Sequence, residues 1–257
     1  RRDPDTLYDV HALAVDDNPT NLEILCGQMR ALGMACDTLE DPARVVERLR
    51  GALSSSPYRI ALIDMNMPGM TGLELAGAIR ADAGLDGIAL ILLTSQSDEN
   101  DLNRARAAGF SAALQKPVRT EELQAALERA ARSALVQNHR PPAPLPPETS
   151  PRALPPNRTA EPTGAAEARE PRFDPSLLLE MQALTREDGP DLAREVVALY
   201  LAESPGLLSR MRAGAEANSW SEVKRIAHSL KGSSRHVGEL RLAALCQQAE
   251  TFAAAGS

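Results

Sequence analysis

Five short apolar segments alternate with amphipathic helical segments over the first half of the chain, and this alternation restricts the fold more than any other feature. The apolar segments are residues 11–15, 35–39, 59–64, 88–93 and 112–115. Short runs that are apolar on both faces are typical of strands buried in a parallel sheet. Strands that alternate with helices form such a sheet with helices on both sides and right-handed crossovers. We therefore predict an α/β fold with a doubly wound, five-stranded parallel sheet.

Acidic, hydroxyl and basic side chains stand where these predicted strands end. They are Asp16, Asp17, Asp64, Thr94 and Lys116, from four different strands. Because the carboxyl ends of parallel strands meet at one edge of a sheet, we expect these side chains to gather there. Clustered carboxylates raise one another's pKa unless a cation is present, and Mg²⁺ prefers such oxygen ligands. The sequence predicts a Mg²⁺ site at which Asp64 is a nucleophile toward phosphorus, with Lys116 and Thr94 contacting phosphoryl oxygens.

These residues, together with the motif Asp-Met-Asn-Met-Pro-Gly-Met at 64–70 and the Lys-Pro pair at 116–117, resemble a two-component receiver domain over residues 10–135. The resemblance implies a flavodoxin-like strand order 2-1-3-4-5. It implies that Asp64 is the phosphoacceptor, that Asp17 binds Mg²⁺ directly, and that Asp16 acts mostly through water. The backbone carbonyl of Asn66 is implied to complete the protein ligands.

Two positions near the last strand carry further expectations from the resemblance. The peptide bond between Lys116 and Pro117 is implied to be cis, which proline permits. Receivers often have Tyr or Phe three residues before the lysine, whereas this chain has Ala113. The conformational output of this receiver is therefore left open.

Residues 136–171 differ in composition from the segments on either side. Ten of the 19 prolines of the chain lie in this stretch, and no periodic apolar pattern continues through it. We predict a Pro-rich flexible linker between two domains.

The remaining residues, 172–257, have helical patterns throughout. Asp174 and Pro175 are typical of a helix start, as the N-cap and the first helical residue. Three apolar stripes follow, at residues 192–200, at residues 223–230, and at Leu242, Leu245, Ala249 and Phe252. Amphipathic helices with short connections predict an all-α helical bundle.

His228 lies on the helix expected around residues 223–237, about opposite the apolar stripe at about 100° per residue. We therefore expect its imidazole to face water, beside a cationic patch of Lys224, Lys231 and Arg235 that would stabilise phosphate. Gly232 costs about 1 kcal/mol relative to Ala inside a helix, so we expect it to leave space for a partner to approach.

The run His228-Ser-Leu-Lys231-Gly232-Ser-Ser resembles the motif of histidine-containing phosphotransfer (HPt) domains. The resemblance implies that His228 is phosphorylated and that Lys231 and Gly232 shape its surroundings. Such bundles usually have one more helix after the one expected to end near residue 255. We therefore expect this domain to be truncated at its C-terminus.

Together the two resemblances predict a phosphorelay segment like the C-terminal part of a hybrid sensor histidine kinase. Asp64 would receive a phosphoryl group from an upstream kinase histidine, and His228 would pass it to a downstream response regulator. One alternative is a receiver that acts as a phosphate sink or kinase regulator without transfer to His228. Others are a phosphatase with an Asp nucleophile, disfavoured because Asn66 replaces the required second acid, and a purely structural receiver. Only phosphotransfer and weak hydrolysis of phospho-Asp64 are expected as activities.

Composition excludes several other classes of function. The net charge of −7 gives no support to nucleic-acid binding, and no apolar run is long enough to span a membrane. Cys26, Cys36 and Cys246 lack metal or redox spacing, so we expect reduced thiols and a cytoplasmic location. Because the chain begins with Arg, we expect a segment of a longer protein, which an inner-membrane anchor could hold.

Overall fold

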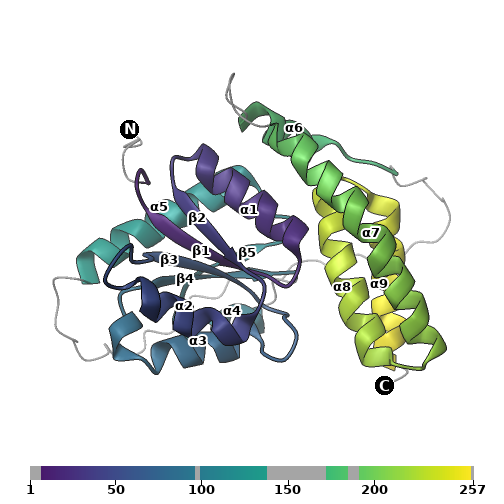
Figure 1. The fold of residues 1–257 in the computed structure, drawn as a ribbon, viewed down its shortest axis with the longest axis horizontal. Helices are drawn as coiled ribbons and strands as arrows, with labels where there is room; N and C mark the ends of the chain where they lie inside the picture. The colour runs from purple at the N-terminus through teal and green to yellow at the C-terminus, as the bar shows by residue number, and fades with distance from the viewer. Residues whose placement is uncertain (1–6, 96–98, 138–171, 185–190, 256–257) are drawn as a thin grey trace, which may run out of the picture.

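The computed structural model describes residues 7–95, 99–137, 172–184 and 191–255. These residues form an α/β domain and a bundle of helices that lie side by side (Figure 1). The predicted linker, residues 136–171, lies outside the described residues except for its first two positions, which belong to the last helix of the α/β domain.

Five parallel strands form one sheet in the order β2-β1-β3-β4-β5, which confirms the predicted topology. The strands are β1 His11–Val15, β2 Ala35–Leu39, β3 Ile60–Asp64, β4 Ala89–Thr94 and β5 Phe110–Gln115. The helices between and after them are α1 Pro19–Ala31, α2 Val45–Ala52, α3 Gly72–Arg80, α4 Glu99–Ala107 and α5 Thr120–Gln137. Short 3-10 turns at Pro42–Arg44 and Ala83–Leu85 complete the domain. β5 begins two residues earlier than predicted because Phe110 is buried in the core.

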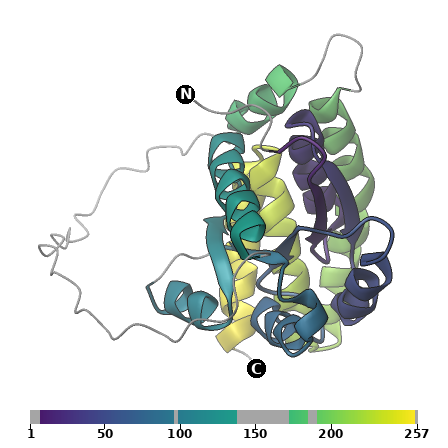
Figure 2. The ribbon, with the colours of Figure 1, turned by 90° about the vertical axis from the view of Figure 1, so that its left-hand side faces the viewer.

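Helices cover both faces of the sheet, so each strand contributes to two apolar layers. α1 and α5 lie on one face, and α2, α3 and α4 lie on the other (Figure 2). On β3, Leu62 packs into the first layer, whereas Ala61 and Ile63 pack into the second. Burial on both faces explains why β3 is a continuous apolar run, and it holds Asp64 rigidly at the end of the strand.

The prediction that the cysteines remain reduced is wrong for two of them. Cys26 on α1 and Cys36 on β2 form a disulfide, with Cα atoms 5.4 Å apart. Packing of α1 beside β2 brings the residues together, and this separation is typical of disulfides. Cys246 is a free, buried thiol.

Four helices form the second domain over the described residues. They are α6 Ser176–Leu184, α7 Leu192–Glu216, α8 Trp220–His236 and α9 Leu240–Ala255. Val196, Tyr200 and Leu230, from the first two predicted stripes, are buried in the bundle core.

The stripe predicted on α9 is wrong in part, since Leu242 packs against the bundle core but two of the other residues do not. Leu245 and Phe252 are exposed, and the smaller residues Ala243, Cys246 and Ala253 are buried instead. α9 lies close beside α8 along its length (Figure 1), and small side chains permit this approach. Apolar periodicity alone therefore selected the wrong face of the helix.

The two domains contact each other through α1. Ile24 on α1 is fully buried among apolar side chains of the bundle, including Met181 and Leu192. Beside it, Gly27 faces the side chain of Leu192 so closely that a Cβ atom at position 27 would overlap it. The absence of a side chain at this position therefore lets α7 approach α1.

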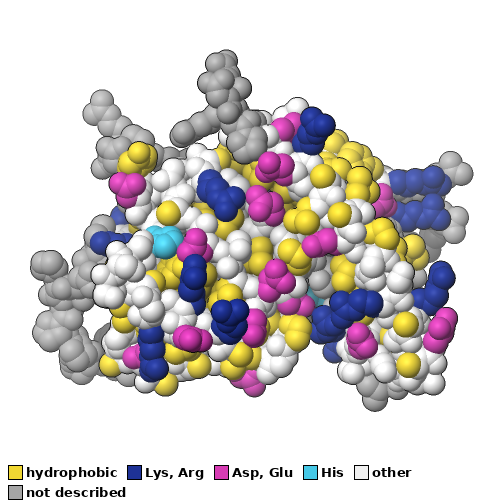
Figure 3. All heavy atoms as spheres, viewed as in Figure 1, with side chains coloured by type: hydrophobic (Ala, Val, Ile, Leu, Met, Phe, Trp, Pro, Cys, Tyr) yellow, Lys and Arg dark blue, Asp and Glu magenta, His cyan; other side chains and the backbone are white. Residues whose placement is uncertain are grey.

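The surface carries charged side chains of both signs. On the face drawn in Figure 3, basic and acidic side chains are interspersed. Among the residues described, every helix is too short or too polar to span a lipid bilayer.

We expect Gly27→Ala to weaken the contact between the domains, although Ala is the better helix former. The added methyl group would overlap Leu192, and overpacking of this kind costs about 1–3 kcal/mol. The matched control is Gly77→Ala on α3, where a Cβ would meet nothing within 4 Å. The control should raise the free energy of unfolding by about 0.5–1 kcal/mol. Calorimetry, with amide exchange at the start of α7, measures both effects; equal stabilisation by the two variants would contradict the proposed contact.

Candidate functional site

Three carboxylates meet at the carboxyl edge of the sheet. Asp16 and Asp17 follow β1 and Asp64 ends β3, and one carboxylate oxygen of each lies within 4.8 Å of the others. Asp16 and Asp64 are almost completely buried, whereas Asp17 is half-buried. The predicted gathering of acids at this edge is therefore present.

Lys116, at the end of β5, joins two of these acids. Its Nζ lies 2.6 Å from Oδ2 of Asp16 and 2.7 Å from Oδ1 of Asp64. Burial alone would lower the pKa of Lys116, but the two carboxylates outweigh burial and raise that pKa above its usual value. The peptide bond to Pro117 is cis, as predicted.

Lys116 contacts only two of the three acids, so negative charge remains at this edge. Burial raises the pKa of Asp64 to about 6, with a further rise from Asp16 and an opposing effect of Lys116. Burial and Asp16 also raise the pKa of Asp17. Arg225 lies 3.6 Å from Asp17 and opposes the rise in the pKa of that acid. Oxygen donors at this spacing also fit a hard divalent ion such as Mg²⁺.

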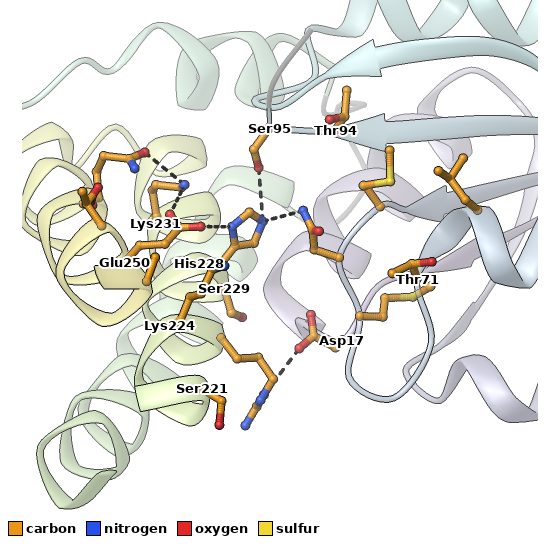
Figure 4. Close-up of a pocket in the computed structure, with 18 of the residues that line it drawn as sticks. Asp17, Thr71, Thr94, Ser95, Ser221, Lys224, His228, Ser229, Lys231 and Glu250 are labelled. Atoms are coloured by element: carbon orange, nitrogen blue, oxygen red, sulfur yellow. Dashed lines mark hydrogen bonds and ion pairs between the residues drawn. The ribbon is translucent and has the colours of Figure 1, made fainter. Parts of the chain in front are cut away.

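The other predicted receiver residues surround this edge. Thr94 ends β4 and is buried, and with Ser95 it lines a cavity of about 660 Å³ that also contains Asp17 (Figure 4). The backbone N–H of Asn66 donates to Asp64 at 3.3 Å, and the Asn66 side chain lines the same cavity. Ala113, where an aromatic residue is common, is a half-buried residue of β5.

His228 forms part of the opposite wall of this cavity, and its two ring nitrogens have different partners (Figure 4). Nδ1 lies 2.7 Å from a carboxylate oxygen of Glu250 on α9. Because an ionised carboxylate only accepts hydrogen bonds, Nδ1 carries the proton. Nε2 faces the first domain, 3.4 Å from the side-chain nitrogen of Asn66 and 3.3 Å from the hydroxyl of Ser95. In the neutral ring, the lone pair of Nε2 therefore points at these two receiver side chains, which line the same cavity as Asp17.

The prediction that His228 faces water needs correction. The ring points away from the bundle core, as its helical position indicated, but the first domain and Glu250 cover it, and its side chain is only 18% exposed. The sequence could not predict this because the covering residues are far away in the chain.

The predicted cationic patch is also wrong in part. Lys231 is buried and donates to Glu250 and Gln247 on α9, so its charge is balanced within the bundle. Lys224 is exposed. Glu250 remains ionised because its hydrogen bonds to His228 and Lys231 outweigh burial and lower its pKa to about 2.

Gly232 lies against α1 of the first domain. A Cβ atom at this position would lie 3.7 Å from the side-chain nitrogen of Asn21, an ordinary contact distance. The position therefore has room for a methyl group. Because a methyl group would fit here, the expectation that Gly232 leaves space for a partner stays a prediction, which concerns larger side chains. The neighbour at this position is the first domain of the same chain.

Further contacts between the domains were not predicted. Arg225, one turn before His228, lies 3.6 Å from Asp17. The side chain of Asn18 donates to the hydroxyl and backbone carbonyl of Ser229 at 2.9 and 3.2 Å. The only available sequence signal was helical spacing, because Arg225, His228, Ser229 and Gly232 lie on neighbouring positions of one face of α8. Glu250 gave no such signal, since its role depends on how α9 packs.

Comparisons with known proteins agree with this geometry. The model of the response regulator receiver domain matches residues 12–128, and that of the Hpt domain matches residues 195–257. The sensor histidine kinase GacS of Pseudomonas protegens is 24% identical over 250 residues, which cover 93% of this chain and 24% of that protein. The virulence sensor protein BvgS of Bordetella bronchiseptica is 30% identical over 234 residues, which cover 89% of this chain and 17% of that protein.

A solved structure of the chemotaxis protein CheY4 of Vibrio cholerae is 24% identical, covering 48% of this chain and 98% of that chain with a TM-score of 0.44. The chain spans a quarter or less of the length of the two sensor proteins. The matched families, in this order, confirm the resemblances drawn from the sequence. The chain consists of a two-component receiver domain followed by a histidine-containing phosphotransfer domain, a combination present in hybrid sensor histidine kinases.

Proposed function

We propose that this chain transfers a phosphoryl group between Asp64 and His228 as one step of a phosphorelay. The observation that carries the proposal is the direction of His228: its Nε2 faces Asn66 and Ser95 of the receiver, which line the same cavity as Asp17, while Glu250 accepts a hydrogen bond from Nδ1. The two domains therefore already face each other as donor and acceptor would.

The transfer requires one bond to form and one to break. The Nε2 lone pair of His228 attacks phosphorus of the acyl phosphate on Asp64, and the bond between phosphorus and the Asp64 oxygen breaks. The electron pair of that bond returns to the Asp64 carboxylate. The ring gains positive charge, which the carboxylate of Glu250 stabilises through the Nδ1 proton at 2.7 Å. The approach needs nitrogen about 3–3.5 Å from phosphorus.

The receiver residues have distinct proposed roles. Asp16, Asp17 and Asp64, with the backbone carbonyl of Asn66, would hold Mg²⁺, which when bound neutralises charge on the phosphoryl oxygens. Lys116 would move from the carboxylates to one phosphoryl oxygen, and the Thr94 hydroxyl would donate to another. Lys231 and Gly232 serve the HPt side, Lys231 by holding Glu250 in place and Gly232 by keeping a long side chain away from Asn21 on α1.

The partners follow from the chemistry of the two acceptors. An upstream histidine kinase domain, in the same full-length protein or another, would phosphorylate Asp64. His228 would deliver the group to a downstream response regulator. The rival role, a receiver that drains phosphate or regulates the kinase without transfer to His228, is disfavoured by the orientation of Nε2. An Asp-nucleophile phosphatase is disfavoured because Asn66 has no acid to protonate a leaving group.

Small-molecule phosphodonors should label Asp64 only when Mg²⁺ is present. Asp64→Asn removes the nucleophile and should abolish this label, while His228→Gln should leave it intact and prevent base-stable label from appearing on α8. The two labels are distinguished because phospho-Asp is base-labile and phospho-His is acid-labile. Labelling that persists in a chelator, or base-stable label on α8 in His228→Gln, would contradict the assignment.

Glu250→Gln should slow transfer from Asp64 to His228 by about ten- to a hundredfold, because a hydrogen bond to a charged group contributes about 1.5–3 kcal/mol. Gln has nearly the same shape but cannot neutralise the imidazolium that forms. Labelling of Asp64 should be unchanged. The matched control is Glu222→Gln, an exposed acid on α8 paired with Arg210. Equal transfer rates in the two variants would show that Glu250 does not assist His228.

Gly232→Ala and Gly232→Gln should have opposite consequences for transfer. The Ala methyl group meets Asn21 at an ordinary 3.7 Å, so transfer should stay at the native rate. The longer Gln side chain would extend toward Asn21 on α1 and should slow transfer, although both residues favour the helix more than Gly does. Single-turnover transfer rates, with circular dichroism to monitor helicity, test this; a native rate in Gly232→Gln would exclude close approach of α1 during transfer.

A further inference from the structure

His236, the last residue of α8, is a second histidine at the contact between the domains, and the relay chemistry does not use it. It lies just over two helical turns beyond His228 and is only 2% exposed. Its ring contacts the segment between β5 and α5, which contains the cis peptide bond of Lys116 and Pro117.

Both hydrogen-bonding partners of His236 are backbone groups, one of which can only accept a hydrogen bond and the other only donate one. Nδ1 lies 3.0 Å from the carbonyl oxygen of Gly232, which only accepts, so Nδ1 carries a proton. Nε2 lies 3.4 Å from the backbone nitrogen of Val118, which only donates, so Nε2 has no proton. The contact therefore requires the neutral ring in one tautomer. A second proton on Nε2 would face the N–H of Val118.

We propose that His236 is a positioning residue of the relay, which holds the β5–α5 segment of the receiver against α8 while neutral and releases it when protonated. The part of this inference that concerns transfer rests on the proposed function, because it assumes that His228 receives the phosphoryl group. The docking part does not depend on phosphorylation.

The position of Val118 explains why this contact matters for the site. Val118 is two residues after Lys116, whose ammonium contacts both Asp16 and Asp64. A hydrogen bond from Val118 to α8 therefore joins the segment that carries Lys116 to the helix that carries His228. Gln28 on α1 donates to the carbonyl of Val118 at 3.3 Å, so both backbone groups of this residue are held.

The charged groups that face His236 within the described residues come from the receiver. Burial, and then the positive charge of Lys116, lower the pKa of His236 to about 4, against smaller opposing effects of Gly232 and Asp16. An exposed histidine has a pKa of about 6.5. Separation of the domains would return His236 to that value, so the separated state binds the proton more tightly. The docking equilibrium constant therefore has its full value above about pH 6.5 and decreases as the pH falls from there toward 4.

The expected size of the effect is about tenfold in the docking equilibrium constant between pH 7.5 and pH 5.5, because each pH unit below about 6.5 changes it about tenfold. His236→Gln separates protonation from hydrogen bonding, since Gln keeps an acceptor but does not titrate near neutrality. His236→Ala removes the acceptor altogether. His11→Gln is the matched control, because His11 begins β1 and pairs with Asp37 and Ser56 inside the receiver.

The test is amide hydrogen exchange at Val118 in the whole chain at pH 7.5 and 5.5, corrected for the intrinsic pH dependence of exchange. In the native protein and in His11→Gln, the protection factor of the Val118 amide should be about tenfold lower at pH 5.5 than at pH 7.5. In His236→Gln the protection factor should be the same at both pH values. In His236→Ala the amide should be unprotected at both pH values. Circular dichroism must show native helicity for each variant. A fully protected Val118 in His236→Ala, or the native pH dependence in His236→Gln, would overturn the proposal.

Transfer kinetics separate this proposal from the proposed function. At pH 7.5, transfer from Asp64 to His228 should be slow in His236→Ala and close to native in His236→Gln. If native protein never transfers but Val118 exchange follows the expected pattern, the relay assignment fails and the docking role of His236 stands. If transfer is native in His236→Ala, the positioning role fails and the relay assignment stands.

Discussion

The shortage of positive charge at the carboxyl edge of the sheet is the constraint on which the rest of the structure depends. Two nearly buried carboxylates, Asp16 and Asp64, share the ammonium of Lys116, and Asp17 lies beside them. Burial and the neighbouring Asp16 raise the pKa of Asp64 to about 6. An edge of this kind favours any cation that reaches it. Arg225 on α8 lies 3.6 Å from Asp17, so the helical domain places a positive charge beside these acids. The same carboxylate oxygens could hold a divalent ion.

Hydrogen bonds of fixed polarity then place a proton on Nδ1 of both histidines on α8. Glu250 can only accept, which places a proton on Nδ1 of His228 and leaves Nε2 directed toward the receiver. The carbonyl of Gly232 and the N–H of Val118 impose the same tautomer on His236. On both histidines, Nε2 is therefore the nitrogen that faces the receiver. The ring of His228 faces Asn66 and Ser95, and the ring of His236 accepts a hydrogen bond from the segment that carries Lys116.

The pattern of apolar residues predicted an element correctly where the burial of that element followed from its own few residues. The buried strand β3 was predicted almost to the residue because a strand covered on both faces must be apolar throughout. The same reasoning failed on α9, where Leu245 and Phe252 are exposed and small residues face the bundle. Periodicity identifies an apolar stripe, but the close approach of α8 favours small side chains. Lys231 was misassigned for a related reason, because its partner Glu250 lies on that same misread helix.

The sequence by itself determined the order of strands and helices, the acids at the ends of β1 and β3, the lysine after β5, and the direction of His228 away from its own core. Each of these follows from a spacing of a few residues or from the rule that parallel strands end at one edge. Only the tertiary structure decided that His228 faces the receiver of its own chain, that Ile24 completes the core of the bundle, and that Cys26 and Cys36 are joined. These contacts depend on how helices and strands pack against one another, most of them between residues more than a hundred positions apart, and no local periodicity encodes that packing.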